Sequence, residues 1–255
     1  MQLSGKRIIV VGAGGRIGQE IVGAALEAGA RVSAVDHSAT ALASLQGRFG
    51  DRAEFHAQAG DITSLTSVSE VLLTASQRFG GVDGSVNAAY PRNANYGRAF
   101  LDVTYEDFCA NVSAHLGGYF LFMQQCARYA IERNIPFSLV NFSSIYGVVA
   151  PRFEIYAGTT MTMPVEYAAI KSGLQHLTRY ATVYARGTAF RANCVSPGGI
   201  LEGQDPRFLE RYSHHCQRKG MLEPEDVIPT VLFLLSDASA YIAGQNIIVD
   251  DGFTL

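Results

Sequence analysis

The 255-residue chain has little charge, and neither sign is concentrated in one region. Charged residues make up 17% of it, the formal net charge is −3, and lysine and arginine form no long run. A nucleic-acid surface or a polybasic membrane patch is therefore not indicated. No apolar run approaches membrane-spanning length, and residues 1–7 leave no space for the apolar core of a signal peptide before the strand-like segment 8–11. We expect a cytosolic protein without nucleic-acid or membrane partners, whose partners are small molecules and copies of itself.

Cysteine and linker-type sequence are also scarce. The four cysteines, Cys109, Cys126, Cys194 and Cys216, lack the paired spacing of metal ligands. In a reducing compartment they are interpreted as buried or unpaired thiols, and no metal site is predicted. No repeat, low-complexity tract or Pro/Ser-rich linker interrupts the chain, and its 48% hydrophobic content is enough for one sizeable core. We therefore predict a single domain over residues 1–255.

What is present is an alternation of short β-branched runs and longer helical segments. This order is typical of parallel strands joined by helical crossovers. The later strand candidates are apolar on both faces, as strands covered by helices on two sides should be. We predict an α/β fold, a Rossmann-like doubly wound parallel sheet of about seven strands. The predicted strands are Arg7–Val11, Arg31–Val35, Glu54–Ala57, Val82–Val86, Phe137–Phe142, Arg191–Val195 and Asn246–Val249, and the early helices are Ile17–Ala28, Ala39–Phe49 and Leu65–Phe79.

One long helix is predicted over Thr104–Arg133, and its apolar stripe is interpreted as core or as a subunit-packing face. The least regular stretches lie near residues 90–100, 147–164 and 198–219. Long irregular segments in a compact domain are usually binding loops or lids, so we predict substrate loops there. Whether the segment 148–164 is a substrate lid or an interface stays open. The stripe of the long helix is Phe108, Val112, His115, Tyr119 and Phe122.

Glycines follow the first predicted strand, in Val11-Gly12-Ala13-Gly14-Gly15-Arg16-Ile17-Gly18, and lead directly into an amphipathic helix. Glycine lets the backbone turn sharply and lets a pyrophosphate come close, while free amide groups and the helix dipole attract its charge. A glycine cluster at such a position can also serve the turn alone. Its place between a strand and a helix near the N-terminus favours a dinucleotide site.

Two acidic residues follow later strands. Asp36 lies about 20 residues beyond the glycines, where a carboxylate can accept hydrogen bonds from the adenosine ribose. A carboxylate repels a 2′-phosphate, and the next residue is His37 rather than Arg or Lys, so we expect NAD, with NADP less favoured. The alternative role of Asp36 is to cap the helix that starts near Ser38. Asp61 can bond the adenine amino group, although capping of the next helix explains it almost as well.

Lysine is scarce, at three residues against 17 arginines, yet Lys171 stands four residues after Tyr167. The spacing puts both side chains on one helix face. A neighbouring ammonium favours the phenolate and lowers the pKa of a tyrosine from its ordinary value of about 10. The pair suits proton exchange. Taken alone, a surface Tyr/Lys pair would be the better interpretation.

With its other motifs, the sequence resembles the short-chain dehydrogenase/reductase family over essentially its whole length. Each motif is short, but their order and spacing together are specific. They are Gly12–Gly18, Asp36, Asp61, Asn87-Ala88-Ala89, Asn111, Asn141-Phe142-Ser143-Ser144, Tyr167 with Lys171, Asn193-Cys194-Val195-Ser196-Pro197-Gly198, and Gly244-Gln245 with Asp250-Asp251-Gly252.

The resemblance implies a catalytic set of four residues. Ser144, rather than Ser143, would hydrogen-bond the substrate oxygen, and Tyr167 would exchange the proton. Lys171 would lower the pKa of that tyrosine and hold the nicotinamide ribose, while Asn111 would complete a water-linked proton relay. The implied NAD-binding residues are Gly12, Gly15, Arg16, Ile17, Gly18, Asp36, Asp61, Ile62, Asn87, Ala88, Ala89, Tyr167, Lys171, Pro197, Gly198 and Ile200.

The glycine turn and two nearby loops depart from the family pattern. Arg16 replaces the middle glycine of the turn, and the spacing that remains is that of the family's sugar-nucleotide branch. Ala89-Tyr90 replaces the common glycine after the Asn-Ala pair, which would narrow the cofactor loop or put Tyr90 into the substrate pocket. No threonine follows Pro197-Gly198 at the usual distance.

The segment between Ser144 and Tyr167 is longer than in most short members of the family. The insertion, Val148–Pro164, is rich in threonine and hydroxyl groups. Together with Arg92 and Arg152 these groups would suit a polyhydroxylated or phosphorylated substrate, and a solvated lid is an equal alternative.

Three functions are compatible with these observations. The first is an NAD-dependent oxidoreductase that interconverts a secondary alcohol and a ketone, on a sugar or sugar-phosphate-like substrate of surface-glycan or deoxysugar metabolism. The second is a 3-ketoacyl thioester reductase, which the polar insertion and the missing basic patch disfavour. The third is a non-catalytic nucleotide-binding regulatory or scaffold protein, which the intact catalytic set disfavours.

Self-association is expected from two apolar helix faces that one domain would struggle to bury, those of Thr104–Arg133 and of the helix from Tyr167 to Tyr184. Proteins that the sequence resembles commonly form tetramers in which the C-terminal strand and tail, here Asn246–Leu255, pack across a second twofold axis. We predict a homotetramer, with a homodimer as the alternative.

Overall fold

Seven parallel strands form one sheet in the computed structural model, which describes residues 2–255. The spatial order is β3-β2-β1-β4-β5-β6-β7, so the direction of winding reverses between β1 and β4. The predicted fold class is confirmed, and of the predicted domain only Met1 lies outside the described residues. The strands are β1 (Arg7–Val11), β2 (Arg31–Asp36), β3 (Phe55–Ala59), β4 (Gly84–Asn87), β5 (Phe137–Phe142), β6 (Phe190–Pro197) and β7 (Asn246–Val249).

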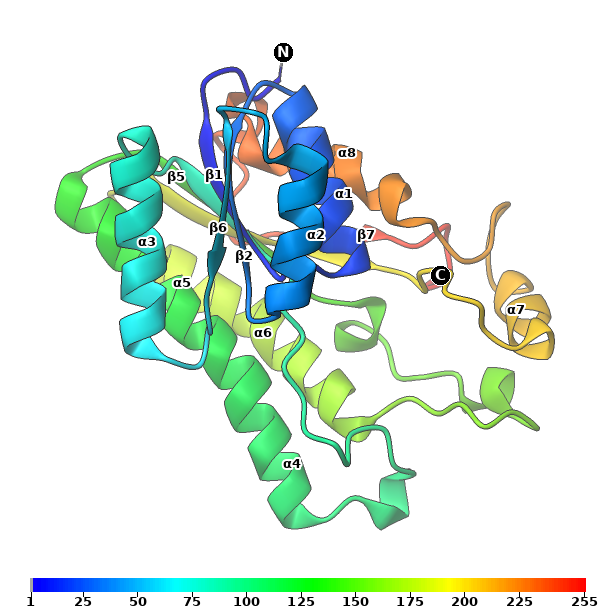
Figure 1. Cartoon of the computed structure of the whole chain (residues 1–255). Coiled ribbons are helices and arrows are strands. Elements are labelled where there is room, and N and C mark those ends of the chain that lie inside the picture. Colours follow the sequence, from blue (N-terminus) through cyan, green and yellow to red (C-terminus); the bar gives the residue numbers. More distant parts are fainter. Residues whose placement is uncertain (1) are drawn as a thin grey trace.

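Helices cover both faces of the sheet (Figure 1). Helices α1, α2 and α8 pack on one face of the sheet, and α3, α5 and α6 pack on the other. Each face has its own apolar core. The bounds predicted for the strands and early helices hold to within two residues at each end. The helices are α1 (Arg16–Glu27), α2 (Ala39–Phe49), α3 (Leu65–Phe79), α4 (Tyr105–Val112), α5 (Gly118–Arg133), α6 (Val165–Tyr184), α7 (Pro206–Ser213) and α8 (Pro224–Leu235).

Burial differs between the middle and the edge of the sheet. Strands β4 and β5 are buried along their whole length, as expected for strands with helices on both sides. Strand β7 is only partly buried, so the prediction of two covered faces is wrong there. The reason is its place at the edge, where it has a neighbouring strand on one side only.

The helix predicted over Thr104–Arg133 contains an irregular turn. Between α4 and α5, residues Ser113–Gly117 form a π-helical turn, η2. The backbone stays right-handed helical through Val112 and Gly117, so the run is continuous. A π turn inserts one extra residue and is often found at functional sites. Here it packs against α6, the helix that carries Tyr167.

The loops beyond the carboxyl ends of the strands pack together into a third apolar cluster. It joins the short 3₁₀ turns η3 (Ile145–Gly147) and η4 (Phe153–Tyr156) to α7 and the C-terminal tail. Ile155 and Tyr156 of the inserted segment are buried in it. The middle of the insertion is therefore a packed part of the domain, and its role in substrate binding stays a prediction.

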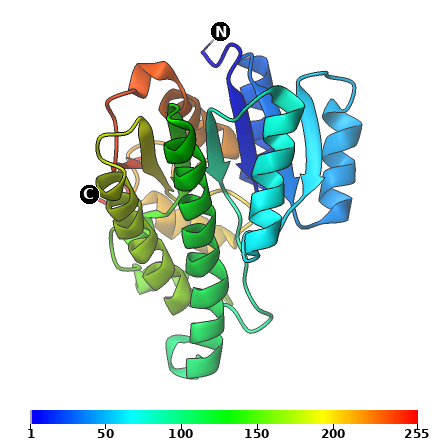
Figure 2. The ribbon, with the colours of Figure 1, turned by 90° about the vertical axis from the view of Figure 1, so that its left-hand side faces the viewer.

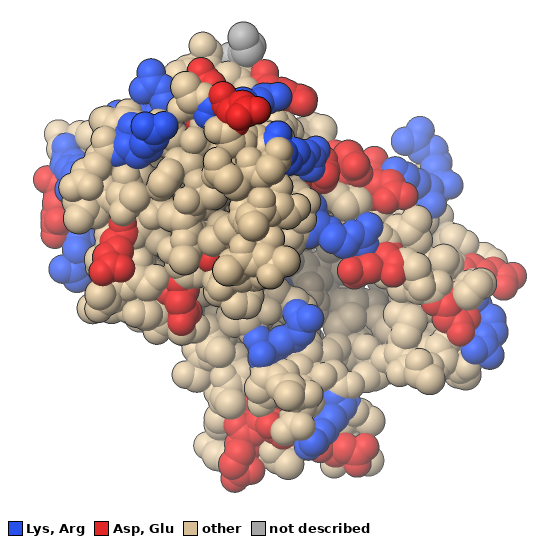
Figure 3. Space-filling view, in the orientation of Figure 1, with Lys and Arg blue, Asp and Glu red and all other residues tan. Residues whose placement is uncertain are grey.

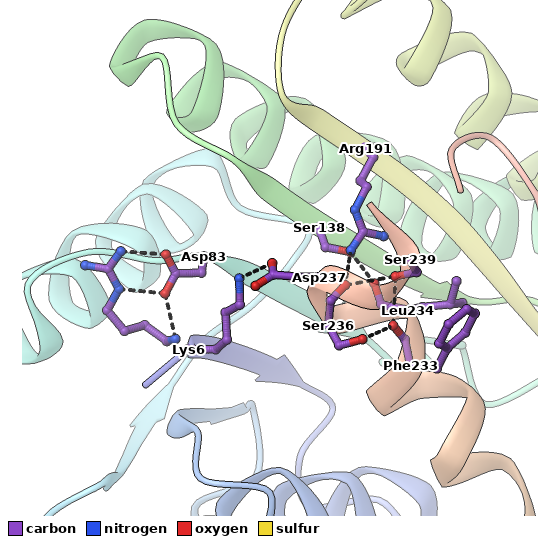
Figure 4. A network of polar contacts seen from close by, with 10 residues as sticks. Lys6, Asp83, Ser138, Arg191, Phe233, Leu234, Ser236, Asp237 and Ser239 are labelled. Atoms are coloured by element: carbon purple, nitrogen blue, oxygen red, sulfur yellow. Dashed lines mark hydrogen bonds and ion pairs between the residues drawn. The ribbon is translucent and has the colours of Figure 1, made fainter. Parts of the chain in front are cut away.

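A polar network joins the strands near their amino ends, on the side of the sheet away from these loops (Figure 4). Arg7 of β1 forms a two-point ion pair with Asp83, with nitrogen–oxygen distances of 2.5 and 2.7 Å. Lys6 contacts Asp237 at 2.5 Å, and Ser138 of β5 donates to the Leu234 carbonyl of α8. These contacts fix the amino ends of the strands and leave the carboxyl ends to the loops.

Candidate functional site

A cavity of about 720 Å³ opens at the carboxyl ends of the central strands. Its wall is made by the turn after β1, the loops after β4, β5 and β6, and the start of α6. Figure 3 shows this part of the surface hollowed, with charges of both signs around the rim. Open parallel sheets bind their ligands at this edge, beside the point where the winding reverses.

The turn after β1 forms one end of the cavity and has no space for side chains. Gly12 has a φ of +73°, and a Cβ there would lie 2.7 Å from the backbone of Ala88. A Cβ on Gly18 would overlap the carbonyl oxygen of Gly12. Gly15 precedes α1 without a side-chain cap, and the first turn of the helix has no acidic residue. The first turn of this helix thus supplies no capping side chain or carboxylate of its own to compete for its amide groups, which fits the pyrophosphate of a dinucleotide.

Asp36 supports this turn from the end of β2. Its carboxylate accepts hydrogen bonds from the backbone N–H groups of Gly14 and Ser38, both at 2.9 Å. The cap of α2 is the hydroxyl of Ser38. The Nδ1 of His37 lies 3.3 Å from the same carboxylate, on a side chain that is 88% exposed. Asp36 therefore places a carboxylate next to the glycines, and its contact with the adenosine ribose stays a prediction.

Asp61 and Ile62 lie beyond β3, away from the residues that line the cavity. The carboxylate of Asp61 accepts hydrogen bonds from the N–H and hydroxyl groups of Thr63. That local cap is the alternative considered for it. Ile62 is buried beside Gly118. A contact of either residue with adenine stays a prediction.

The loop after β4 is held by polar contacts to α5. The Tyr119 hydroxyl lies 3.0 Å from the carbonyl oxygens of both Asn87 and Ala89. The Oδ1 of Asn87 accepts the N–H of Ala89, and within residues 2–255 its buried Nδ2 has no hydrogen-bond partner. Ala88 and Ala89 line the cavity beside the glycine turn, while Asn87 lies behind them.

The two serines after β5 have different surroundings. The hydroxyl of Ser143 donates to the carbonyl of Lys171 and accepts from Gln175, both at 3.0 Å. The Oγ of Ser144 accepts the N–H of Tyr146 at 3.2 Å, which leaves its O–H free to donate. Both residues line the cavity. The geometry supports the choice of Ser144 over Ser143 as the group that faces a substrate.

Tyr167 and Lys171 lie one turn apart on α6 and both line the cavity. The Nζ of Lys171 lies 5.4 Å from the centre of the Tyr167 ring and donates to the carbonyl of Phe142 at 2.8 Å. Burial lowers the pKa of Lys171 to about 7. Burial also raises the pKa of Tyr167, an effect that the Ser144 hydroxyl partly offsets. The net effect on the Tyr167 pKa is thus upward, opposite to the lowering that the sequence predicts from the neighbouring lysine, because burial of the phenol dominates.

Asn111 lies at the end of α4, outside the cavity wall. Its Oδ1 accepts the N–H of Asn93 at 2.9 Å, and its Nδ2 donates to the Oε1 of Glu166 at 3.2 Å. Glu166 is fully buried, and its other carboxylate oxygen has no partner among residues 2–255. The Asn111 amide thus joins the loop after β4 to the start of α6, and its part in a proton relay stays a prediction.

His115 lies behind the cavity in contact with Lys171, whereas the sequence pattern assigned it to the core or a packing face. Its Nε2 lies 3.3 Å from the Nζ of Lys171, and its ring is completely buried. The signal was present in the sequence, because a polar ring interrupts the otherwise apolar stripe of the long helix. Periodicity alone does not tell which face of that helix meets Lys171.

The remaining wall comes from the loop after β6 and the loop after β4. Pro197, Gly198 and Ile200 line the cavity as predicted from the resemblance, next to the glycine turn. Arg16 of that turn lies 3.8 Å from Glu202, so an ion pair spans the two sides of the opening.

The substrate end of the wall is aromatic and carries one arginine. The Tyr90 ring meets the Tyr167 ring edge-on at 5.7 Å, and the Arg92 guanidinium lies 4.6 Å above Tyr90. Thr162 from the insertion also faces the cavity. Arg152 does not, because it points to the carbonyl groups of the C-terminal tail.

Residues 2–255 include no cluster of three or more histidine, cysteine or acidic side chains that could hold a metal ion. Within the same range, no helix combines the length and the apolarity needed to cross a membrane. The four cysteines are unpaired, with Cys126 and Cys194 buried, in agreement with their interpretation from spacing.

The phosphate-compatible turn and the Ser/Tyr/Lys group face one another across a single cavity, which is the arrangement of a dinucleotide-dependent oxidoreductase. The chain belongs to the short-chain dehydrogenase/reductase family. A family model described as enoyl-(acyl carrier protein) reductase matches residues 12–254. The family resemblance stated from sequence is confirmed, and the activity class is that of an NAD(P)-dependent oxidoreductase.

Among its relatives is the post-translational flagellin modification protein A of Campylobacter coli, 36% identical over 99% of this chain and 100% of the relative. Carbonyl reductase (NADPH) 2 of Sus scrofa is 32% identical over 99% of this chain and 98% of its own. A short-chain dehydrogenase structure from Leptospira borgpetersenii with bound NAD+ has a TM-score of 0.86 and 31% identity, covering 100% of this chain and 94% of that one.

Proposed function

We propose that this chain is an NAD-dependent oxidoreductase that interconverts a secondary alcohol and a ketone on a sugar or sugar-phosphate-like substrate. The observation that carries the proposal is the single cavity with a glycine turn at one end and Ser144, Tyr167 and Lys171 at the other. The nicotinamide of the bound dinucleotide supplies the acceptor or donor of the hydride.

Tyr167 handles the proton in this proposal. In oxidation its phenolate takes the proton of the substrate hydroxyl as the C–H bond breaks, and in reduction its hydroxyl gives that proton back to the ketone oxygen. The free O–H of Ser144 can donate to the same oxygen. Because burial raises the pKa of Tyr167, its protonated form is ready for reduction, and oxidation needs help from a charged Lys171. Asn111 completes a water-linked proton relay in this proposal, and its amide is bonded to Glu166 at the start of α6.

Asp36 is the reason to propose NAD rather than NADP. Asp36 is 7% exposed, and the hydrogen bond from Gly14 holds its carboxylate in place. A 2′-phosphate bound there would meet this fixed negative charge. Burial of two like charges together is costly unless a cation intervenes. The neighbouring His37 provides that cation only when it is protonated, and Arg16 is engaged with Glu202.

The sugar-like substrate is proposed from the polar groups near Tyr90. Arg92 has no acidic partner within 4 Å among residues 2–255, so its guanidinium is free to bind a phosphate or a set of hydroxyl groups. Thr162 adds a hydroxyl to the same wall. One relative is named for post-translational modification of flagellin. That name supports a substrate from which a group attached to protein is made.

An absorbance screen of NADH formation and consumption tests this proposal. The panel holds free sugars, sugar phosphates, nucleotide sugars, their keto forms and acyl thioesters, with the Tyr167→Phe variant as the control for turnover at this site. We expect turnover on a sugar derivative. Turnover on 3-ketoacyl thioesters alone would replace the substrate class, and NAD binding without turnover on any member would favour the regulatory or scaffold alternative.

We also propose a homotetramer, with a homodimer as the alternative. Figure 2 shows α5 and α6 side by side on one face, and the apolar residues Phe120, Tyr180, Val183 and Tyr184 are exposed there. Leu255 is 99% exposed at the tail, whereas Phe253 is already buried on Tyr212 of its own chain. Light scattering with size exclusion at micromolar concentration tests this, because an active 27.5 kDa species would contradict it.

A cytosolic location is part of the proposal. Cell fractionation with antibody detection tests it. Recovery of the protein outside the cytosolic fraction would contradict it.

A further inference from the structure

The fully buried His115 lies among aromatic rings behind Lys171 (0% exposed). Its ring centre is 5.2 Å from that of Tyr90 and 5.3 Å from that of Tyr119. The Nζ of Lys171 lies 3.3 Å from its Nε2 and 2.8 Å from the Phe142 carbonyl oxygen. An ammonium group has three N–H donors, and these two contacts account for two of them. The centre of the Tyr167 ring lies 5.4 Å from the same Nζ.

The charged form of Lys171 requires one tautomer of the imidazole. A charged lysine can only donate, so when Lys171 is charged the Nε2 of His115 accepts and its proton lies on Nδ1. Within the described chain that buried Nδ1 has no hydrogen-bond partner. Burial, Lys171 and Arg92 together lower the pKa of His115 to about 2, which keeps the ring neutral at any working pH.

No carboxylate shares this role. Lys171 forms no ion pair with any acidic group of residues 2–255 within 4 Å, so the neutral imidazole and a carbonyl are its acceptors. The titratable and charged groups around His115, Lys171 and their neighbours are Tyr90, Arg92, Tyr119, Glu166, Tyr167 and Cys194.

We propose that His115 is a positioning residue that acts through Lys171: its Nε2 holds the lysine in the charged form and aims it at Tyr167, so that the tyrosine can ionise. The inference rests on the proposed proton transfer by Tyr167. It differs from the relay predicted for Asn111, whose amide bonds to Asn93 and Glu166 rather than to the lysine.

Loss of the acceptor has a defined consequence. Burial already lowers the pKa of Lys171 to about 7, and removal of the Nε2 lone pair lowers it further. A hydrogen bond to a charged group is worth about one to two pKa units. At neutral pH the lysine would then be mostly uncharged, and oxidation would reach its maximal rate only at higher pH.

The scarcity of lysine makes this measurable without a substrate. The chain has only Lys6, Lys171 and Lys219, so protein labelled with ¹³C at the lysine Cε gives three side-chain signals, and Lys171→Met assigns the buried one. We would follow their chemical shifts from pH 5 to 10 in the wild type, His115→Phe and His115→Gln. Lys6 and Lys219 serve as internal controls.

We expect His115→Phe, which keeps a flat ring but no acceptor, to shift the Lys171 titration down by about one to two pH units. His115→Gln, which keeps an accepting oxygen, should restore most of the shift. An unchanged or raised titration in His115→Phe would overturn the proposal, as would equal shifts in both variants. If His115→Phe does not fold, His115→Leu takes its place with the same expectation.

A kinetic readout separates this proposal from the proposed function. With any alcohol found in the screen, the acid limb of kcat for oxidation should shift to higher pH in His115→Phe while KM changes little. A shifted Lys171 titration in an enzyme without sugar turnover would contradict the substrate class and leave the role of His115 standing. An unshifted titration in an active enzyme would do the reverse.

Discussion

Substitution of Gly12 by alanine tests how closely the glycine turn approaches the backbone of the loop after β4. Gly12 has a φ of +73°, a conformation that costs an L side chain roughly 1–2 kcal/mol. The new Cβ would also lie 2.7 Å from the carbonyl group of Ala88 and from the nitrogen of Ala89, and this backbone cannot rotate away as a side chain would. Overpacking of this kind costs a further 1–3 kcal/mol, so we expect the free energy of unfolding to fall by about 2–5 kcal/mol.

Gly5 offers the matched control, because it has a φ of +74° and no atom within 4 Å of an added Cβ. Gly5→Ala should therefore lose only the conformational part, about 1–2 kcal/mol. Urea unfolding at one fixed protein concentration measures both, since association would otherwise change the apparent stability. NAD binding by titration calorimetry should weaken at least about tenfold in Gly12→Ala and stay unchanged in Gly5→Ala. Equal losses of stability in the two variants would refute the close approach of Gly12 to Ala88.

Three further predictions follow from the site. Tyr167→Phe should lower kcat by about 10²–10⁴-fold with NAD affinity nearly intact, and Lys171→Ala should harm both; near-wild-type turnover in Tyr167→Phe would end its role in proton transfer. Wild-type protein should bind NAD(H) more tightly than NADP(H) by calorimetry, and Asp36→Asn should narrow the difference by at least about tenfold because a charge is removed; equal binding in the wild type would end the NAD assignment. The pKa of Lys171 falls from 10.5 to about 7 on folding, so the unfolded chain binds more protons between these values. The destabilising effect of the buried charge is complete below pH 7 and is relieved above it. The free energy of unfolding of the wild type relative to Lys171→Met should therefore rise by about 1.4 kcal/mol per pH unit from pH 7.5 to 9.5. A difference that does not change with pH in urea unfolding would contradict the burial of the charge.

The sheet could be predicted from sequence because its signal is local. Short strand segments such as Phe137–Phe142 are buried on both faces, and they alternate with helical segments that must cross over them. The burial of β7 could not be predicted in this way. Its composition matches that of the central strands, and its exposure depends only on its position at the sheet edge.

The site was predictable where backbone geometry dictates the residue type. Gly12 and Gly18 must lack a side chain, and Tyr167 and Lys171 must be one helical turn apart. The direction of a long side chain is not dictated in this way. Arg152, proposed for substrate from its place in the insertion, instead reaches the C-terminal tail, which is distant in sequence.

The long helix shows the same limit at the catalytic centre. Asn111 and His115 are four residues apart, so a regular helix would place both on one face and leave the choice between them open. In the structure a π turn begins at Ser113, and the two residues contact different parts of α6: Asn111 meets Glu166 while His115 meets Lys171. Asn111 is identified from sequence because it matches a motif of the family. The 3.3 Å distance between the nitrogen atoms shows that a histidine is in contact with the lysine. The role proposed for His115 in the ionisation of Tyr167 rests on that contact rather than on the motif.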